Sequence, residues 1–362
     1  MKMKTIKKMT FAALLAATTL MTGCENADVD FPDYDGGISA YFPYQTPIRT
    51  LILGTDEYEG AVELDHQHKF KIMATMGGSY SGRDINLGIT VDESLIDNLQ
   101  FKTTGQPVVL MPSNYYQLES SSIDFKGDVK AGVVVSLTDD FFRDPKSCTL
   151  NYVIPVRIVS SANVDHVIAG EAADNVSNPV RTCAEDWKVA PMDYTLYAVK
   201  YISKYHAYYV RLGEDQVTYN GKTVKQERAQ SLMSGVSHSG SDDEIVSTST
   251  IFTNQVKYPV EIKIGEEGVD QKVLNYDLIL TFDDNDNCTI TSGTSGVTIS
   301  GSGYYGTKTE KLAWGNKDRD GMHLDYTVEY EDGTKIVSKD ILVWRNHGVN
   351  MPEEFEMVYT GK

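Results

Sequence analysis

The residues in this sequence with the clearest chemical potential are aromatic. The chain holds 22 tyrosines and three tryptophans, and six of the tyrosines lie between residues 194 and 209. Flat aromatic rings stack on sugar rings, while neighbouring carboxylates and amides bind the hydroxyls. We therefore expect a glycan site with Tyr205, Tyr208 and Trp314, which adjoin turns, and with Asp318 as a hydroxyl acceptor. The alternative is that tyrosine fills sheet positions, where it is favoured, and that Trp314 anchors a hairpin.

No catalytic motif accompanies these rings. The sequence has no G-x-S-x-G, H-E-x-x-H or P-loop pattern. A glycosidase pairs its two carboxylates in space rather than in sequence, so the 51 acidic residues do not decide for or against one. We expect that the protein is not an enzyme. A glycoside hydrolase or accessory carbohydrate-active enzyme is the first alternative, and a structural or adhesin-like surface component is the second.

Three turns rich in aspartate resemble cation sites only in part. The first, at 283–287, begins like an EF-hand loop, but Cys288 occupies the sixth position and Thr294 the twelfth. Hairpin turns explain these segments better, and the sequence leaves calcium binding open. No cysteine and histidine cluster has zinc-site spacing. We expect no metal site and no cofactor.

Three cysteines follow the N-terminal one: Cys148, Cys183 and Cys288. An odd number cannot form a complete set of disulfides. The sequence leaves open whether Cys148 pairs with Cys183, and three separate thiols are the favoured alternative.

The first 23 residues have the pattern of a bacterial lipoprotein signal. Lysines lie near the start, an apolar stretch covers residues 11–21, and a glycine precedes Cys24. The stretch is too short to span a bilayer, so we expect cleavage before Cys24 and lipid attachment at Cys24. An ordinary secretory signal is the alternative. Residues 24–37 then form an acidic tether, and the lipid would be the sole contact with the membrane.

The net charge excludes one class of partner. The formal charge is −18 for the whole chain, and loss of a signal with four lysines and no acid makes it −22. Nucleic acids and anionic lipid surfaces attract basic patches. We therefore expect no nucleic-acid partner and a location outside the cell.

Strands are expected along nearly the whole chain. Short apolar or alternating runs are separated by turn-rich clusters, which is typical of antiparallel sheets. Residues 38–160 predict an immunoglobulin-like β-sandwich, with runs at 68–76, 85–91, 132–138 and 151–160. Residues 161–190 lose this pattern and predict an interdomain connection. Residues 191–362 predict an antiparallel meander barrel or a curved β-sandwich. Only 92–101 and 139–144 indicate helical turns.

Several long stretches resemble known families. YFPYQTPIRTLILG (41–54), MPSNYYQL (111–118), LTDDFF (137–142) and YVIPVRI (152–158) resemble the N-terminal domain-of-unknown-function family 1735 of Bacteroidetes lipoproteins. DWKVAPMDYTLYAVKYISKYHAYYVRLG (186–213) and WGNKDRDGMHLDYTV (314–328) resemble the companion C-terminal family 4361.

The resemblance implies a context rather than a catalytic site. Such lipoproteins belong to polysaccharide utilisation systems beside outer-membrane glycan importers. It implies an outer-membrane, lipid-anchored, cell-surface protein that binds extracellular glycan without cleaving it, with importer components as further partners. The acidic residues after Cys24 resemble the surface-export signal of these lipoproteins, and a plain solvated linker is the alternative.

Overall fold

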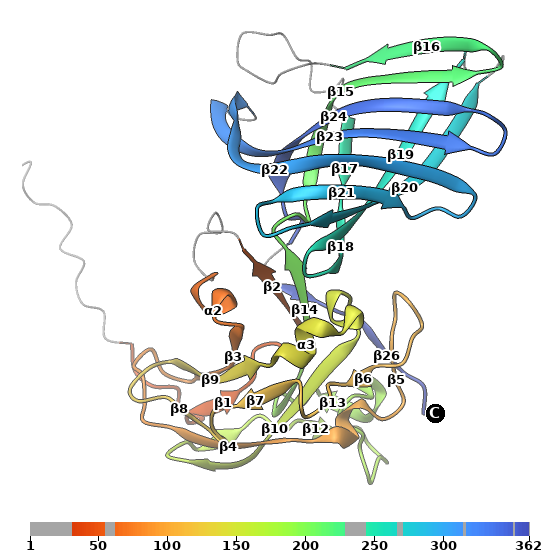
Figure 1. Cartoon of the computed structure of the whole chain (residues 1–362). Helices are drawn as coiled ribbons and strands as arrows, with labels where there is room; N and C mark the ends of the chain where they lie inside the picture. The colour runs from red at the N-terminus through yellow and green to blue at the C-terminus, as the bar shows by residue number, and fades with distance from the viewer. Residues whose placement is uncertain are drawn as a thin grey trace, which may run out of the picture.

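The structure is a computed structural model that describes residues 31–54, 62–228, 244–265, 271–313, 316–349 and 352–361. The expected signal peptide, Cys24 and Trp314 lie outside the described residues. Strands dominate and form two domains, one above the other in Figure 1. The prediction of an all-β fold is confirmed.

The lower domain in Figure 1, here the sandwich domain, consists of two facing sheets. The smaller sheet contains β11 (His166–Val167), β1 (Ser39–Tyr41), β3 (Lys69–Gly77), β9 (Lys130–Leu137) and β7 (Tyr116–Leu118), in this spatial order. The larger contains β25 (Glu353–Glu354), β2 (Pro47–Leu53), β14 (Tyr194–Ser203), β10 (Tyr152–Ala162), β4 (Asn86–Val91) and β8 (Ser122–Asp124), with β6 (Val109–Leu110) beside β10. Alternation explains most of these strands, because every second residue of β3 is buried between the sheets.

The central strands β10 and β14 are covered on both faces. Their inward residues, such as Ile154 and Tyr197, join the core between the sheets. Their outward residues, such as Val153 and Leu196, join a second apolar cluster with Phe101 and Phe355. Double coverage explains why both strands are nearly continuous apolar runs rather than alternating ones.

Strand pairing corrects the predicted domain boundaries. Residues 194–203 form β14, which pairs with β10 and β2 and therefore belongs to the sandwich domain. The chain also returns to this domain at its end, where β25 pairs with β2 and β26 (Met357–Tyr359) pairs with β5 (Leu99–Phe101). The boundary at 191 is thus wrong, and the second domain is inserted between β14 and β25.

Residues 161–190, expected as a connection, carry strands of their own. β11 extends the smaller sheet beside β1, and β12 (Glu171–Ala172) pairs with β13 (Trp187–Val189). The segment therefore packs onto the sandwich domain instead of linking two separate bodies.

The inserted domain, residues 204–349, is one strongly curved antiparallel sheet (Figure 1). Its spatial order is β16 (Lys222–Glu227), β15 (Tyr208–Tyr219), β24 (Lys335–Asn346), β23 (Lys317–Tyr330), β22 (Val297–Ala313), β21 (Asn287–Ser292), β20 (Lys272–Phe282), β19 (Gln255–Ile264) and β18 (Ser249–Phe252), and β17 (Glu244–Ser247) also pairs with β15. The sheet curls around an apolar core on its inner face. It meets the sandwich domain where Ser203 N donates a 3.0 Å hydrogen bond to Thr250 Oγ1.

The helices are short and peripheral: α2 (Val62–His66), α3 (Asp139–Arg143), η1 (Glu93–Ile96), η2 (Pro145–Cys148) and η3 (Ala184–Asp186). The expected turn at 139–144 matches α3, but of the run 92–101 only 93–96 is helical and 99–101 is strand β5. Among the described helices none is long and apolar enough to cross a membrane.

The three cysteines of the described chain are separate, buried thiols. Cys148 packs into the sandwich core and Cys288 into the core of the inserted domain. A bridge between Cys148 and Cys183 is therefore not formed.

Candidate functional site

Tyr205, expected as an exposed stacking residue, is buried. Only 6% of it is exposed, its ring stacks on Phe282 with centroids 3.7 Å apart, and its hydroxyl donates a 2.6 Å hydrogen bond to Asp286. The segment after β14 turns this ring into the core of the inserted domain. The expectation of exposure is wrong, because the sequence of a turn does not specify the direction of its ring.

Tyr208 and Asp318 lie at the surface but do not meet. Tyr208 is 46% exposed at the start of β15. Asp318 accepts hydrogen bonds from Leu312 N at 3.0 Å and from Lys311 Nζ at 2.9 Å, which fixes the tip of the β22–β23 hairpin. No hydrogen bond or ring contact joins the predicted residues within the described ranges. The structure therefore does not bring the predicted set together.

The outer face of the curved sheet carries a different polar surface. Ser302, Asp325, Lys339 and Glu214 lie directly opposite one another on β22, β23, β24 and β15, and we call this set the outer row. Successive strand residues point to opposite faces. The outer row therefore faces away from the core, because the residues on either side of Asp325, Lys339 and Glu214 are buried.

An aromatic pair lies beside the outer row, two residues further along β22 and β23 and therefore on the same face. Tyr304 and His323 are cross-strand neighbours, and their rings stack with centroids 4.8 Å apart at an interplanar angle of 7°. His323 Nε2 lies 2.8 Å from Glu310 Oε1, and this hydrogen bond lowers the pKa of Glu310. The imidazole is thus held in place on one side by a carboxylate and on the other by a ring.

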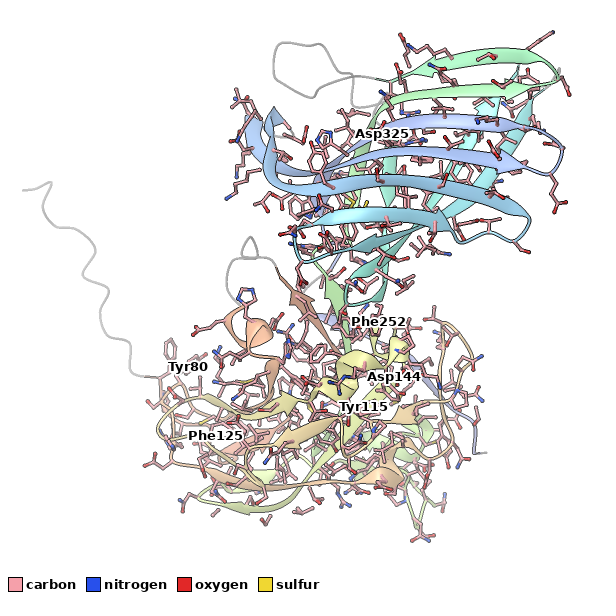
Figure 2. All side chains as sticks on the ribbon, viewed as in Figure 1. Tyr80, Tyr115, Phe125, Asp144, Phe252 and Asp325 are labelled. Carbon is pink, nitrogen blue, oxygen red and sulfur yellow. The ribbon has the colours of Figure 1, made fainter. Side chains whose placement is uncertain are left out.

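A hollow of about 300 Å³ opens along this surface. Its lining includes His323, Asp325, Lys339 and Glu214. Asp325, labelled in Figure 2, and Lys339 have no side-chain partner among the described residues, whereas Glu214 binds Lys225 Nζ at 2.9 Å. The hollow therefore offers a free carboxylate and a free ammonium group beside a flat aromatic pair.

The end of the β22–β23 hairpin folds over the same outer face. Ala313, near its tip, packs against Val210, Leu212 and Val343 on the outer face. Asp320 holds the hairpin from within, since it accepts hydrogen bonds from the Tyr305 hydroxyl and from Lys308 N. The aspartates of this turn thus fix backbone, as hairpin turns do. No cluster suited to a metal ion occurs within the described part of the chain.

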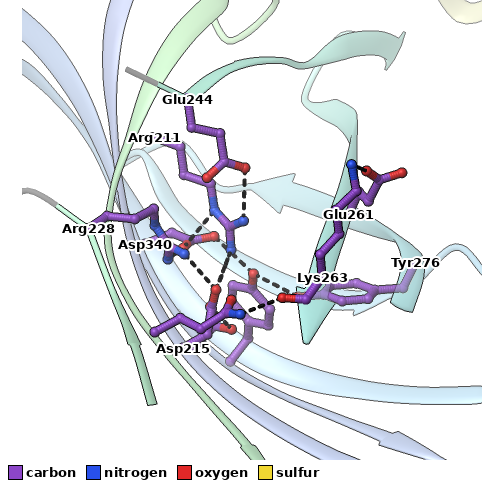
Figure 3. Close-up of polar contacts among 11 residues, drawn as sticks. Arg211, Asp215, Arg228, Glu244, Glu261, Lys263, Tyr276 and Asp340 are labelled. Atoms are coloured by element: carbon purple, nitrogen blue, oxygen red, sulfur yellow. Dashed lines mark hydrogen bonds and ion pairs between the residues drawn. The ribbon is translucent and has the colours of Figure 1, made fainter. Parts of the chain in front are cut away.

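An ion network, drawn in Figure 3, lies on the inner face of the same strands. Arg211 donates hydrogen bonds to Asp340 at 3.0 Å and to Asp215 at 3.2 Å. Arg228 donates to the same two carboxylates, and Glu244 accepts from Arg211 at 3.2 Å. Arg211, Asp215 and Asp340 are at most 2% exposed.

The network explains how the outer row is positioned. Asp215 and Asp340 are chain neighbours of Glu214 and Lys339, so ionic contacts on one face fix the strands that present side chains on the other. Burial raises the pKa of Asp340. Burial would also raise the pKa of Asp215, but the hydrogen bond from Arg228 and the charge of Arg211 outweigh it, and the net shift is downward.

Sequence reasoning missed the outer row, although a signal was present. Tyr304 and Tyr305 are adjacent in a strand, so alternation requires one ring to point inward and the other outward. Tyr305 is 5% exposed and Tyr304 is 44% exposed. For the network, the signal was a charged residue at an inward position of the alternating pattern, as at Arg211.

Comparison with known proteins finds two family models and two solved structures. A domain of unknown function, DUF5627, matches residues 204–348, which is the inserted domain almost to the residue. A model of an N-terminal domain matches residues 34–165. Family numbers 1735 and 4361, expected from the sequence, stay predictions. No curated protein gives a significant match.

One solved structure is similar throughout. It is a Bacteroides ovatus protein of unknown function from structural genomics, 39% identical, with a TM-score of 0.80 over 91% of this chain and 100% of that chain. A second, a candidate carbohydrate binding protein from Bacteroides ovatus ATCC 8483, is 10% identical over 88% of this chain and 87% of that one. Its TM-score is 0.26, which is too low to indicate a shared fold or function.

Proposed function

This chain belongs to the family of the 39% identical Bacteroides ovatus protein of unknown function, and from that premise we propose that it is a lipid-anchored surface protein that binds extracellular glycan without cleaving it. The binding surface is the outer face of the inserted domain, at the outer row and the Tyr304–His323 pair. The sandwich domain acts as the spacer between this surface and the membrane.

The proposal rests on one observation. The stacked Tyr304–His323 pair lies beside a hollow in which Asp325 and Lys339 have no side-chain partner among the described residues. A sugar ring presents an apolar face and a polar edge. Tyr304 and His323 offer a surface for the face, while Asp325 and Lys339 offer an acceptor and a donor for the hydroxyls. Few polar groups beside apolar or aromatic walls are the usual make-up of a ligand site.

The carboxylates at this surface favour binding over hydrolysis. Glycosidases use two carboxyl groups on either side of the scissile bond. Here Glu310 is bonded to His323, Glu214 is paired with Lys225, and Asp340 is buried in the ion network. Among the described residues that line the hollow, Asp325 remains as the one unpaired carboxylate, which suits a hydroxyl acceptor rather than an acid and nucleophile pair.

Anchoring at the outer membrane is a further part of the proposal. It rests on the lipoprotein signal pattern before Cys24 and on the acidic tether. Partnership with outer-membrane glycan importers rests on the family resemblance of the sequence. Cys24→Ala should yield a protein without lipid that leaves the membrane fraction, and a variant still bound through lipid would contradict the assignment.

The experiment is a glycan-array screen of a soluble form that starts at Asp35, followed by calorimetric titration of the strongest glycan. Tyr304→Ala should weaken binding about threefold to tenfold, because loss of a stacked ring costs roughly 0.5–1.5 kcal/mol beyond its buried area. Asp325→Asn should also weaken it. Tyr80→Ala is the matched control, since Tyr80 is strongly exposed on the sandwich domain (Figure 2).

Melting curves recorded alongside separate loss of binding from loss of fold. Unchanged affinity in folded Tyr304 and Asp325 variants would remove this surface from consideration. Release of new reducing ends from the bound glycan would identify a hydrolase instead.

A further inference from the structure

A second hollow lies in the sandwich domain, whereas the outer row belongs to the inserted domain. It measures about 320 Å³ and is lined by four separate segments: residues 92–98 around η1, Arg157 of β10, residues 179–182, and Tyr359 of β26. Ligand pockets usually span about 300–1,000 Å³, so this hollow has room for a small ligand.

The walls of this hollow are held firmly. Thr360 donates hydrogen bonds through its N–H at 2.8 Å and its hydroxyl at 3.0 Å to the carbonyl of Asn98. On the other side, Val180 N donates to the buried Asp186 at 2.8 Å, and Trp187 Nε1 donates to the carbonyl of Val180 at 2.8 Å. The returning C-terminus and the segment after β12 are thus both fixed, and the site needs little ordering when a ligand enters.

Two arginines line the hollow, and they differ in how many of their N–H groups are hydrogen-bonded. Arg181 donates three hydrogen bonds of 2.9–3.1 Å to the Asp193 carboxylate. Within the described part of the chain, the side chain of Arg157 makes only long polar contacts, 3.4 Å from Nη1 to Asp92 and 3.7 Å from Nε to Asp193, and it is 34% exposed. Arg157 therefore has donors to spare, while Arg181 has its charge neutralised.

The same hollow also contains hydrogen-bond acceptors, the carboxylates of Asp92 and Asp97. Asp97 lines the hollow and its carboxylate has no partner in the described structure. Asp92 is held by Ser94 and Arg157. Burial alone would raise the pKa of Asp92, but these hydrogen bonds lower it, so the carboxylate is ionised at neutral pH. Leu95, Pro179 and the Tyr359 ring supply apolar wall.

The hollow holds groups of both signs. A ligand with one net charge would therefore meet a like charge as well as an opposite one, Asp92 and Asp97 for a carboxylate and Arg157 for a cation. A neutral polyol donates to the carboxylates, accepts from the guanidinium and lays an apolar face on Tyr359. We propose that this hollow binds one neutral monosaccharide unit, as a free sugar or as the end of a longer chain. The proposal does not depend on the outer-face site.

The test is saturation-transfer NMR, with titration of any hit, on the soluble chain. The probes are glucose, galactose, mannose, xylose and N-acetylglucosamine, compared with glucuronate and glucosamine. At least one neutral sugar should bind and the charged ones should bind less well. Asp97→Asn and Tyr359→Ala should each weaken that binding roughly tenfold or more, since hydrogen bonds to a charged group and ring contacts are lost.

Asp284→Asn is the matched control, because Asp284 is an exposed aspartate in a turn of the inserted domain. Tyr304→Ala and Asp97→Asn separate the two surfaces, because a signal lost only in Tyr304→Ala comes from the outer face and a signal lost only in Asp97→Asn comes from this hollow. Binding by the oligomer of the same sugar, equally sensitive to Asp97→Asn, identifies a chain end as the ligand; binding by the monomer alone identifies a free sugar. The proposal is overturned if no neutral sugar binds, if charged sugars bind best, or if Asp97→Asn and Tyr359→Ala both bind as the unaltered protein does.

Discussion

The sandwich domain keeps its buried ion pairs at its periphery, whereas the inserted domain holds its ion network in its interior. Arg49–Asp65 and Arg181–Asp193 lie beside the sandwich core, and both arginines reach solvent. The core between the sandwich sheets is apolar. The Arg211 side chain is 1% exposed, and those of its two aspartates are fully buried.

The difference teaches that two domains built almost entirely of strands can depend on unlike forces. When one side chain of an apolar core is shortened, the cost in stability is the transfer free energy of the removed atoms plus a term for the cavity left behind. A buried ion network loses stability for a different reason, because the remaining charges stay buried without a partner. The inserted domain should therefore respond to loss of charge and to pH, and the sandwich core to loss of volume.

The largest effect is expected for Arg211→Met. It leaves Asp215 and Asp340 buried beside Arg228 alone, which should cost about 3–5 kcal/mol. Urea denaturation with hydrogen exchange read strand by strand should show the loss in the inserted domain. Arg143→Met is the matched control, because Arg143 forms exposed pairs with Asp139 and Asp140 and should cost at most about 1 kcal/mol. Equal losses from the two variants would contradict the comparison.

A second large effect is expected for Phe355→Ala, which lies after the inserted domain in sequence but packs in the sandwich domain. Phe355 is buried and meets the Phe101 ring edge-on at 5.2 Å. Truncation of such a ring costs roughly 3–5 kcal/mol. Exchange should rise in β5, β10 and β14 and stay unchanged in β22 and β23. Faster exchange only in the inserted domain would refute the assignment of the C-terminal strands.

Acid should weaken the junction between the domains through His206. Burial, with His347 and Lys200 nearby, lowers the pKa of His206 to about 4, and its Nδ1 accepts Thr250 N–H at 3.0 Å. An unfolded histidine titrates near 6.5. Between these values the unfolded chain binds more protons, so stability falls as the pH falls. The loss reaches about 3 kcal/mol at pH 4, at roughly 1.4 kcal/mol per unit.

Urea midpoints at pH 7, 5.5 and 4 measure this effect. His206→Asn keeps an acceptor for Thr250 N–H but does not titrate, so its stability should fall less steeply over the same range. Identical slopes for the variant and the unaltered protein would show that other groups cause the loss.

The smallest effect is expected for Ile72→Val in the sandwich core. Ile72 is fully buried between the sheets, and loss of one methyl group costs about 0.5–1.5 kcal/mol. The cost should be the same at pH 7 and pH 5, unlike that of Arg211→Met. A pH-dependent cost would mean that the sandwich core also depends on charge.

The sequence predicted strands well, because alternation and turn residues are local signals. It misplaced β14 because the run 194–202 follows a long irregular segment, and pairing partners are not encoded locally. Its near-continuous apolar character, unlike the alternation of β23, was the signal of a strand covered on both faces. The candidate surface was harder, since the outer row joins residues more than 120 positions apart, from Glu214 to Lys339.

The route of the chain also sets how the protein carries mechanical load. The inserted domain is joined to the sandwich domain by two covalent links, one leaving β14 and one leading to β25, and these strands lie on either side of β2 in a single sheet. A pull on the inserted domain is therefore divided between two strands. Each is tied to β2 by backbone hydrogen bonds, six residue pairs long for β14, and the two links also resist twisting of one domain about the other. A force applied by a polymer bound at the outer face would therefore reach the sandwich domain through two chain segments rather than one.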